Sequence, residues 1–183
     1  MATWVCLLRA INLGSRNKVP MPALREALAV AGFTEVQTYV QSGNLLVSSR
    51  HRSAAAVSEA VRSLVRERFD VDQPVVVRTA EQIRAVVEGN PFAQAGVGRP
   101  KLLHVVFLTG APSAEAVERV HSDELTRDVV RVAGEDMYVD YGESVHASKL
   151  SPAYFSRRLG VEGTARNWRT VLALAEMTSK GAG

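Results

Sequence analysis

The order of apolar patterns along the first 79 residues constrains the fold more than any other feature of the chain. Four short runs have the composition of strands, and two longer runs repeat their apolar residues with a helical period. In chain order they are a strand at 3–11, a helix at 21–31, strands at 35–41 and 44–49, a helix at 53–69 and a strand at 73–78. This order is that of the split βαβ unit, also called ferredoxin-like or α-β plait.

The two central strands of this unit are expected to form a tight hairpin. Only Ser42 and Gly43 separate them, and a two-residue loop that contains glycine is typical of such a turn. With this loop, Gln41 and Asn44 would be opposite neighbours on one face of the sheet.

The same order of patterns recurs after residue 100. A helix near Ala80–Glu88 and a loop with proline and glycines separate the two sets. The second set consists of a strand at 102–108, a helix at 113–121, a hairpin of 127–133 and 137–141, a helix at 151–159, a strand at 162–167 and a helix at 168–178. In the last helix the residues expected to face inward are Trp168, Val171, Leu172 and Ala175.

We therefore predict an α+β fold of two ferredoxin-like (α-β plait, βαββαβ) halves in tandem, with an extra C-terminal helix. The predicted domain limits are 1–79 for the first half, 80–100 for a helix and linker, and 101–183 for the second half.

The composition narrows the classes of protein to which the chain can belong. The 183 residues are 46% hydrophobic, which is enough for a core, and no apolar run approaches the ~18 residues that a membrane span needs. We expect a cytoplasmic protein with no membrane partner. The single cysteine, Cys6, excludes an intrachain disulfide, and the four histidines lack the spacing of a zinc site. We expect neither a metal nor a cofactor.

Positive charge gathers at the beginning of several predicted helices. The helix dipole favours acidic side chains there by about 0.3–1 kcal/mol. Four helices instead have cations before or within the first turn, namely Arg16 and Lys18, Arg50 and Arg52, Lys149, and Arg166 with Arg169. Free N–H groups beside cations make a natural anion site. The simpler alternative is that these long side chains extend into solvent.

Several phrases resemble those of a known family. They are "LLRAINLGSRNKVPM" from Leu7, "TYVQSGN" at 38–44, Asn90 to Phe92, Ser148 to Leu150, and "TARNWRT" at 164–170. In this order along nearly the whole chain, they are similar to the bacterial domain-of-unknown-function family sixteen-ninety-seven. The resemblance implies two α-β plait halves and brings no established activity. Ala10 stands where the family usually has glycine, and Ala173 where many members have lysine.

From these cations and the amides beside them we predict a ligand site in a basic cleft between the two halves. The predicted ligand-binding residues are Arg9, Asn12, Asn17, Lys18, Gln41, Asn44, Ser148, Lys149, Arg166 and Asn167. The expected ligand bears a phosphate and is either a nucleotide or a nucleic-acid backbone. Sequence-specific RNA binding is disfavoured, because the third strand lacks the stacking aromatic residues of RNA-recognition sheets.

Two other functions stay open at the level of sequence. The chain could be an enzyme acting on a small phosphorylated compound, with Lys18, Lys149 and Arg166 as electrostatic clamps. No catalytic residue can be named, and His146 is the only histidine that we would test as a general base. Alternatively, the chain is a structural or assembly module that forms a homodimer through its sheets and binds no small ligand.

Overall fold

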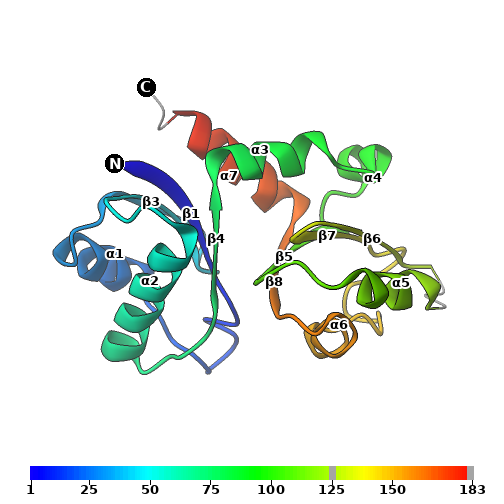
Figure 1. The fold of residues 1–183 in the computed structure, drawn as a ribbon, viewed down its shortest axis with the longest axis horizontal. Coiled ribbons are helices and arrows are strands. Elements are labelled where there is room, and N and C mark those ends of the chain that lie inside the picture. Colours follow the sequence, from blue (N-terminus) through cyan, green and yellow to red (C-terminus); the bar gives the residue numbers. More distant parts are fainter. Residues whose placement is uncertain (124–126, 181–183) are drawn as a thin grey trace. The chain divides into compact units, whose positions relative to one another are not determined.

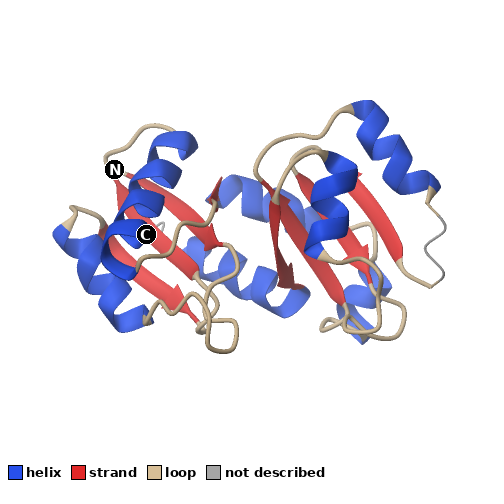
Figure 2. Cartoon of the chain, turned by 90° about the horizontal axis from the view of Figure 1, so that it is seen from below, coloured by secondary structure: helices blue, strands red, loops and turns tan. Residues whose placement is uncertain are grey.

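The chain forms two compact units, each built around one four-stranded sheet. The computed structural model describes residues 1–123 and 127–180. The first unit comprises Met1–Arg84 and the chain from Leu174 onward, and the second comprises Ala85–Ala173. Figure 2 shows the strands of each sheet in red and the helices in blue. The predicted α+β class is therefore correct.

The first unit follows the predicted order of elements (Figure 1). Its elements are β1 (Ala2–Leu8), α1 (Met21–Val30), β2 (Thr34–Tyr39), β3 (Asn44–Ser49), α2 (Ala54–Phe69) and β4 (Val75–Thr79). The sheet order is β2-β3-β1-β4, and all neighbouring strands are antiparallel. The division between the units falls within the helix that follows, α3 (Ala80–Glu88).

The second unit has the same order of strands. Its elements are α4 (Ala93–Gly98), β5 (Leu103–Leu108), α5 (Ala114–Ser122), β6 (Val129–Ala133), β7 (Asp136–Asp140), α6 (Pro152–Leu159) and β8 (Gly163–Asn167). The antiparallel sheet has the order β6-β7-β5-β8. The terminal helix α7 (Trp168–Lys180) contains the second point of division between the units. The predicted domain limits place all of α7 with the second half, and they stay a prediction.

The two sheets share details of hydrogen bonding as well as strand order. The amide of Leu8 donates to the Gly43 carbonyl at 2.8 Å, and that of Leu108 donates to the Glu135 carbonyl at 2.9 Å. Likewise Cys6 lies opposite Val77, and Val106 lies opposite Ala165. Positions 100 residues apart in β1 and β5 therefore have corresponding surroundings.

Helix ends are set by local side chains, as their sequences suggest. The Ser53 hydroxyl accepts from the Ala56 amide at 3.2 Å at the beginning of α2, and Ser113 and Ser151 cap α5 and α6 in the same way. The helices α3 and α7 follow Thr79 and Asn167, whose side-chain oxygens accept from the amides of Gln82 and Thr170. The helix α6 ends at Gly160, which has a φ of 71° that glycine adopts at little cost.

One face of each sheet packs against two helices of its own unit, α1 and α2 in the first and α5 and α6 in the second. In the first unit Leu24 and Leu28 of α1 and Val57 of α2 are fully buried in one cluster with alternate residues of the strands. In the second unit Val120 of α5 and Phe155 of α6 belong to the corresponding cluster. Truncating a leucine or phenylalanine of these clusters to alanine costs about 2–5 kcal/mol.

Three local predictions are wrong. The loop between β2 and β3 has four residues, because Val40 and Gly43 adopt positive φ and the chain needs 40–43 to reverse. Residues 93–98 form α4 and not a loop. In α7 the buried stripe is Trp168, Val171, Leu174 and Thr178, and Leu172 is 42% exposed.

Candidate anion site

The long connection between β1 and α1 has an unusual backbone. Ala10, Asn12 and Asn17 have φ values of 50°, 53° and 48°, and Gly14 has 57°. A non-glycine residue in this left-handed region costs about 1–2 kcal/mol, and asparagine tolerates it best. The loop also folds back on itself, since the Asn12 amide donates to the Asn17 carbonyl at 2.9 Å and the Arg16 amide to the Leu13 carbonyl at 3.0 Å. Such strain persists only where the surroundings hold it in place.

The side chain of Asn12 is the main support of this loop. Its Nδ2 donates to the carbonyls of Val19 and Gln41, each at 2.9 Å, and its Oδ1 accepts from the Val19 amide at 2.9 Å. Asn17 Nδ2 donates to the Ala10 carbonyl at 2.7 Å. Both amides therefore hold the loop in shape, and Asn12 also ties it to the turn at 40–43.

That turn brings Gln41 near the loop and buries Asn44. Tyr39, and not Gln41, lies opposite Asn44, so the predicted Gln41–Asn44 pair is wrong. The physical reason is the longer, four-residue turn. Asn44 is fully buried, and its Nδ2 donates to the Tyr39 carbonyl and the Ser42 hydroxyl, both at 3.0 Å. Gln41 is exposed, and its backbone carbonyl is what contacts Asn12.

Gly43 is required where the turn meets the loop. Its φ is 74°, and a Cβ placed on it would lie 2.7 Å from the Cβ of Leu8 and 2.8 Å from a methyl carbon of Ile11. Because both neighbours are buried, neither can move away easily.

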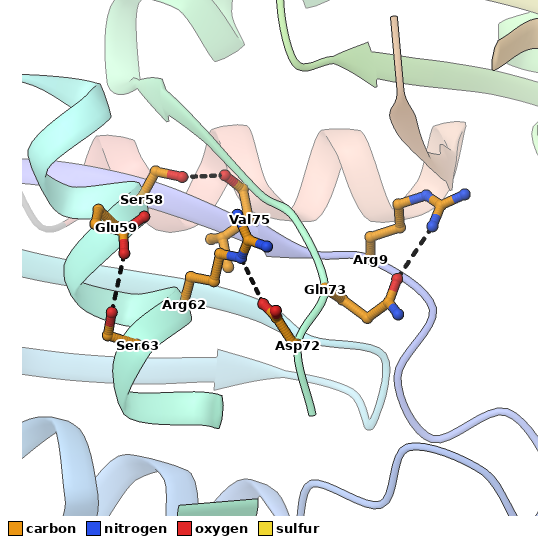
Figure 3. A network of polar contacts seen from close by, with 8 residues as sticks. All are labelled: Arg9, Ser58, Glu59, Arg62, Ser63, Asp72, Gln73 and Val75. Atoms are coloured by element: carbon orange, nitrogen blue, oxygen red, sulfur yellow. Dashed lines mark hydrogen bonds and ion pairs between the residues drawn. The ribbon is translucent and has the colours of Figure 1, made fainter. Parts of the chain in front are cut away.

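Three cations lie on this loop, and they differ in surroundings. Arg9 is half-buried, and its Nη1 donates to Gln73 Oε1 at 3.1 Å (Figure 3). Gln73 follows Asp72, which pairs with Arg62 at 2.6 Å, and that hydrogen bond lowers the pKa of the Asp72 carboxyl. Arg16 and Lys18 are exposed, and the Lys18 Nζ reaches the Gly14 carbonyl at 2.5 Å.

The helix that follows these cations begins without a side-chain cap. Pro20 occupies the N-cap position of α1, no side chain accepts from the first-turn amides, and the first turn contains no acidic residue. Each of the other described helices with eight or more residues begins with a serine, threonine or asparagine oxygen as acceptor. The start of α1 thus combines uncapped N–H groups, a favourable dipole and exposed cations.

Ser148 and Asn167, two predicted site residues of the second unit, have local partners. Ser148 donates to Asp128 Oδ2 at 2.6 Å and accepts from the Leu150 amide at 3.0 Å, so it orders its own loop. Lys149 is exposed. Asn167 is the N-cap of α7.

Arg166 is the most buried of the predicted cations, with 7% of its surface exposed. It donates to the Thr164 hydroxyl at 2.7 Å and to the Ala165 carbonyl at 2.8 Å. Burial lowers the pKa of its guanidinium to about 10, which still leaves it protonated at neutral pH. The gathering of residues from both units around one cleft stays a prediction.

Sequence reasoning found the cations of this loop but missed its supports. Gln73, which accepts from Arg9, lies 64 residues away along the chain, and no sequence pattern indicated this contact. The missing cap of α1 could have been predicted from the sequence, since Val19 and Pro20 stand where serine, threonine, aspartate or asparagine would be expected.

The fold and the β1–α1 loop define the class of protein to which the chain belongs. It is an α+β protein with two sheets and a basic loop before its first helix, and side-chain hydrogen bonds within the loop hold its shape. A family model described as "Protein of unknown function (DUF1697)" matches residues 1–138. The chain therefore belongs to this family, as its motifs suggested.

Other comparisons agree on the fold. The chain is similar to the solved structure of the conserved bacterial protein SP0830 from Streptococcus pneumoniae, with a TM-score of 0.75 and 23% sequence identity. The similarity covers 96% of this chain and 98% of that one, and at this identity it concerns the fold alone. No curated protein matches the chain. Among the described residues, no helix has the length and apolarity needed to cross a membrane.

Proposed function

We propose that the protein is a binding module for a phosphate-bearing ligand, either a nucleotide or a nucleic-acid backbone. The proposed contacts are the exposed side chains of Arg16 and Lys18 and the first backbone amides of α1. We infer that Asn12 and Asn17 act indirectly, by fixing the loop that presents these groups. We further propose that the two units are ferredoxin-like halves in tandem and that the protein is cytoplasmic.

The observation that carries the proposal is the uncapped start of α1 behind a strained basic loop. A connection from β1 to α1 does not by itself require three non-glycine residues in the left-handed region. Nor does a stable helix benefit from a missing cap, which costs about 1 kcal/mol. A bound phosphate would accept from the free amides and neutralise the cations, and both costs would then serve binding.

The alternative enzyme function has less support. His146 is exposed in the loop before Ser148, and His121 Nε2 accepts from the Val132 amide at 3.3 Å. His104 is held neutral at physiological pH, because burial lowers its pKa to about 4. None of these three histidines lies on the loop with the cations.

Affinity for AMP and for a short single-stranded RNA tests the proposal. We expect salt-sensitive binding that falls about three- to tenfold in Lys18→Ala and in Arg16→Ala, because each variant removes one charge-assisted contact. For RNA, a plot of the logarithm of the association constant against the logarithm of the salt concentration should have a slope of about −1.4 if two phosphates are contacted. In either variant the slope should be about −0.7, because one contact is left.

A matched control is Lys101→Ala, which removes an exposed lysine of the second unit. It should leave both affinity and salt slope unchanged. Equal losses in Lys18→Ala and Lys101→Ala would contradict a local site and would indicate a general effect of net charge.

A further inference from the structure

The first unit has a groove between its two helices, α1 and α2. The volume of the groove is about 330 Å³, which lies within the range of roughly 300–1,000 Å³ that small-molecule sites occupy. Ala27 and Ala31 of α1, Ala60 and Leu64 of α2, and the buried Phe33 supply most of its apolar lining. The groove can therefore hold the aliphatic part of a small molecule.

In the second unit a carboxylate joins the corresponding two helices. Asp123, the C-cap residue of α5, accepts from Arg158 Nε at 2.9 Å. It also accepts from Arg158 Nη2 and from the Tyr154 hydroxyl. Both donors belong to α6, and two bonds from one guanidinium are the geometry in which arginine best binds a carboxylate.

The first unit keeps the arginine of this arrangement but lacks the carboxylate. The C-cap residue of α1 is Ala31, whereas that of α5 is Asp123. Both α2 and α6 end at a C-cap with left-handed backbone, and Arg68 and Arg158 each stand two residues before that cap. Among the described residues, Arg68 has no ion-pair partner. Ala31 and Arg68 both line the groove, so the groove lies where the second unit has its bridging carboxylate.

A second charged side chain at the groove, that of Glu67, is placed unfavourably for stability. It lies in the last turn of α2, where the helix dipole disfavours an acidic group. No ion pair within the described part of the chain offsets this cost, and the nearby Ser63 hydroxyl donates to Glu59 instead. The last turn of α1, which also borders the groove, contains no basic residue. Glu67 and the negative end of the α1 dipole thus both favour a cation in the groove.

We propose that this groove binds a free amino acid with an aliphatic side chain, such as leucine. Arg68 would bind the ligand carboxylate in the way that Arg158 binds Asp123. Glu67 would pair with the ligand ammonium group, and the aliphatic side chain would lie against Phe33 and Leu64. An apolar lining with a few polar groups that fix orientation is the usual composition of small-molecule sites. This site lies at the opposite end of α1 from the proposed phosphate site and does not depend on it.

An amide NMR titration of the full chain with L-leucine tests the proposal. We expect saturable shifts at the amides of Ala31, Phe33 and Leu64. Arg68→Ala should weaken binding about tenfold or more, because it removes charge-assisted bonds to the carboxylate. The matched control is Arg66→Ala, which removes an exposed arginine of the same helix outside the groove lining and should leave the affinity unchanged.

The contribution of Glu67 is tested with 4-methylpentanoate, which has the carbon skeleton of leucine without the amino group. The parent protein should bind it about three- to tenfold more weakly than leucine, and this preference should disappear in Glu67→Gln. Equal affinity of the parent for both compounds would overturn the pairing of Glu67 with the ammonium group.

The comparison between the units supplies the sharpest variant. Ala31→Asp places a carboxylate where α5 has Asp123, so it should pair with Arg68 and abolish leucine binding. Ala31→Asn, of nearly the same size but neutral, should retain binding, and both changes are at an exposed position. Leucine binding that persists in Ala31→Asp, equal losses in Arg68→Ala and Arg66→Ala, or no saturable shifts in the parent would overturn the site.

Discussion

Replacing Asn12 by alanine should destabilise the protein far more than its surface position suggests. The change removes three hydrogen bonds, two to Val19 and one to the Gln41 carbonyl. At about 0.5–1.5 kcal/mol for each bond, the loss is roughly 2–4 kcal/mol. The Gln41 bond is exposed and contributes toward the lower limit. Alanine also tolerates the φ of 53° less well than asparagine does.

Urea unfolding of three variants would measure this effect. For Asn12→Ala we expect a free energy of unfolding lower by about 2–4 kcal/mol, which corresponds to a fall in Tm of roughly 5–15 °C. Asn12→Gly should recover about 1 kcal/mol of the loss, because glycine accepts the left-handed backbone. Lys18→Ala, at an exposed position of the same loop, should change stability by less than about 0.5 kcal/mol. An Asn12→Ala variant within 0.5 kcal/mol of the parent would refute the role of Asn12 as the support of the loop.

Three further outcomes are expected. Gly43→Ala should lower the free energy of unfolding by about 2–4 kcal/mol, since its Cβ would lie 2.7 Å from that of Leu8 at a φ of 74°; Gly134→Ala, with a φ of 61° and open space around it, is the control that isolates backbone strain. The free energy of unfolding should fall as the pH is lowered from 6.5 toward 4, because burial lowers the pKa of His104 to about 4 and only the unfolded chain binds a proton at this histidine in that range. His104→Gln should reduce this dependence of stability on pH. His51→Gln, at an exposed histidine, is the control and should leave it unchanged. Cys6 should react with thiol reagents only after unfolding, because it is fully buried and burial raises its thiol pKa to about 12; rapid labelling of the native protein would contradict its burial.

The order of elements was predictable because each element has its own local period. The helix at 53–69 carries an apolar stripe and a serine cap, and the structure places α2 at Ala54–Phe69 behind Ser53. The same reasoning failed at 40–43, where a valine adopts a φ of 51° that its branched side chain disfavours. A two-residue turn is the better local choice, but in the longer turn the Gly43 carbonyl accepts from the amide of Leu8, which is distant in sequence.

The charged residues of the candidate site could be predicted from the sequence, but the hydrogen bonds that hold its loop in place could not. Arg16, Lys18 and the absence of a cap before Met21 are features of one short stretch, so sequence alone identifies them. The roles of the amides depend on tertiary contacts, such as that of Asn12 with Gln41, which lies 29 residues away. We therefore interpret Asn12 and Asn17 as supports of the loop, although composition alone groups them with the cations as ligand contacts.

The measurement that tests the central claim most directly is an amide NMR titration of the full chain with AMP at low salt. If a phosphate binds at the start of α1, the largest saturable shifts should occur at the amides of Arg16, Lys18, Met21 and Ala23, and they should shrink as salt is added. Saturable shifts centred elsewhere, or none in this stretch at millimolar AMP, would contradict the claim that the basic loop and the uncapped helix form an anion site.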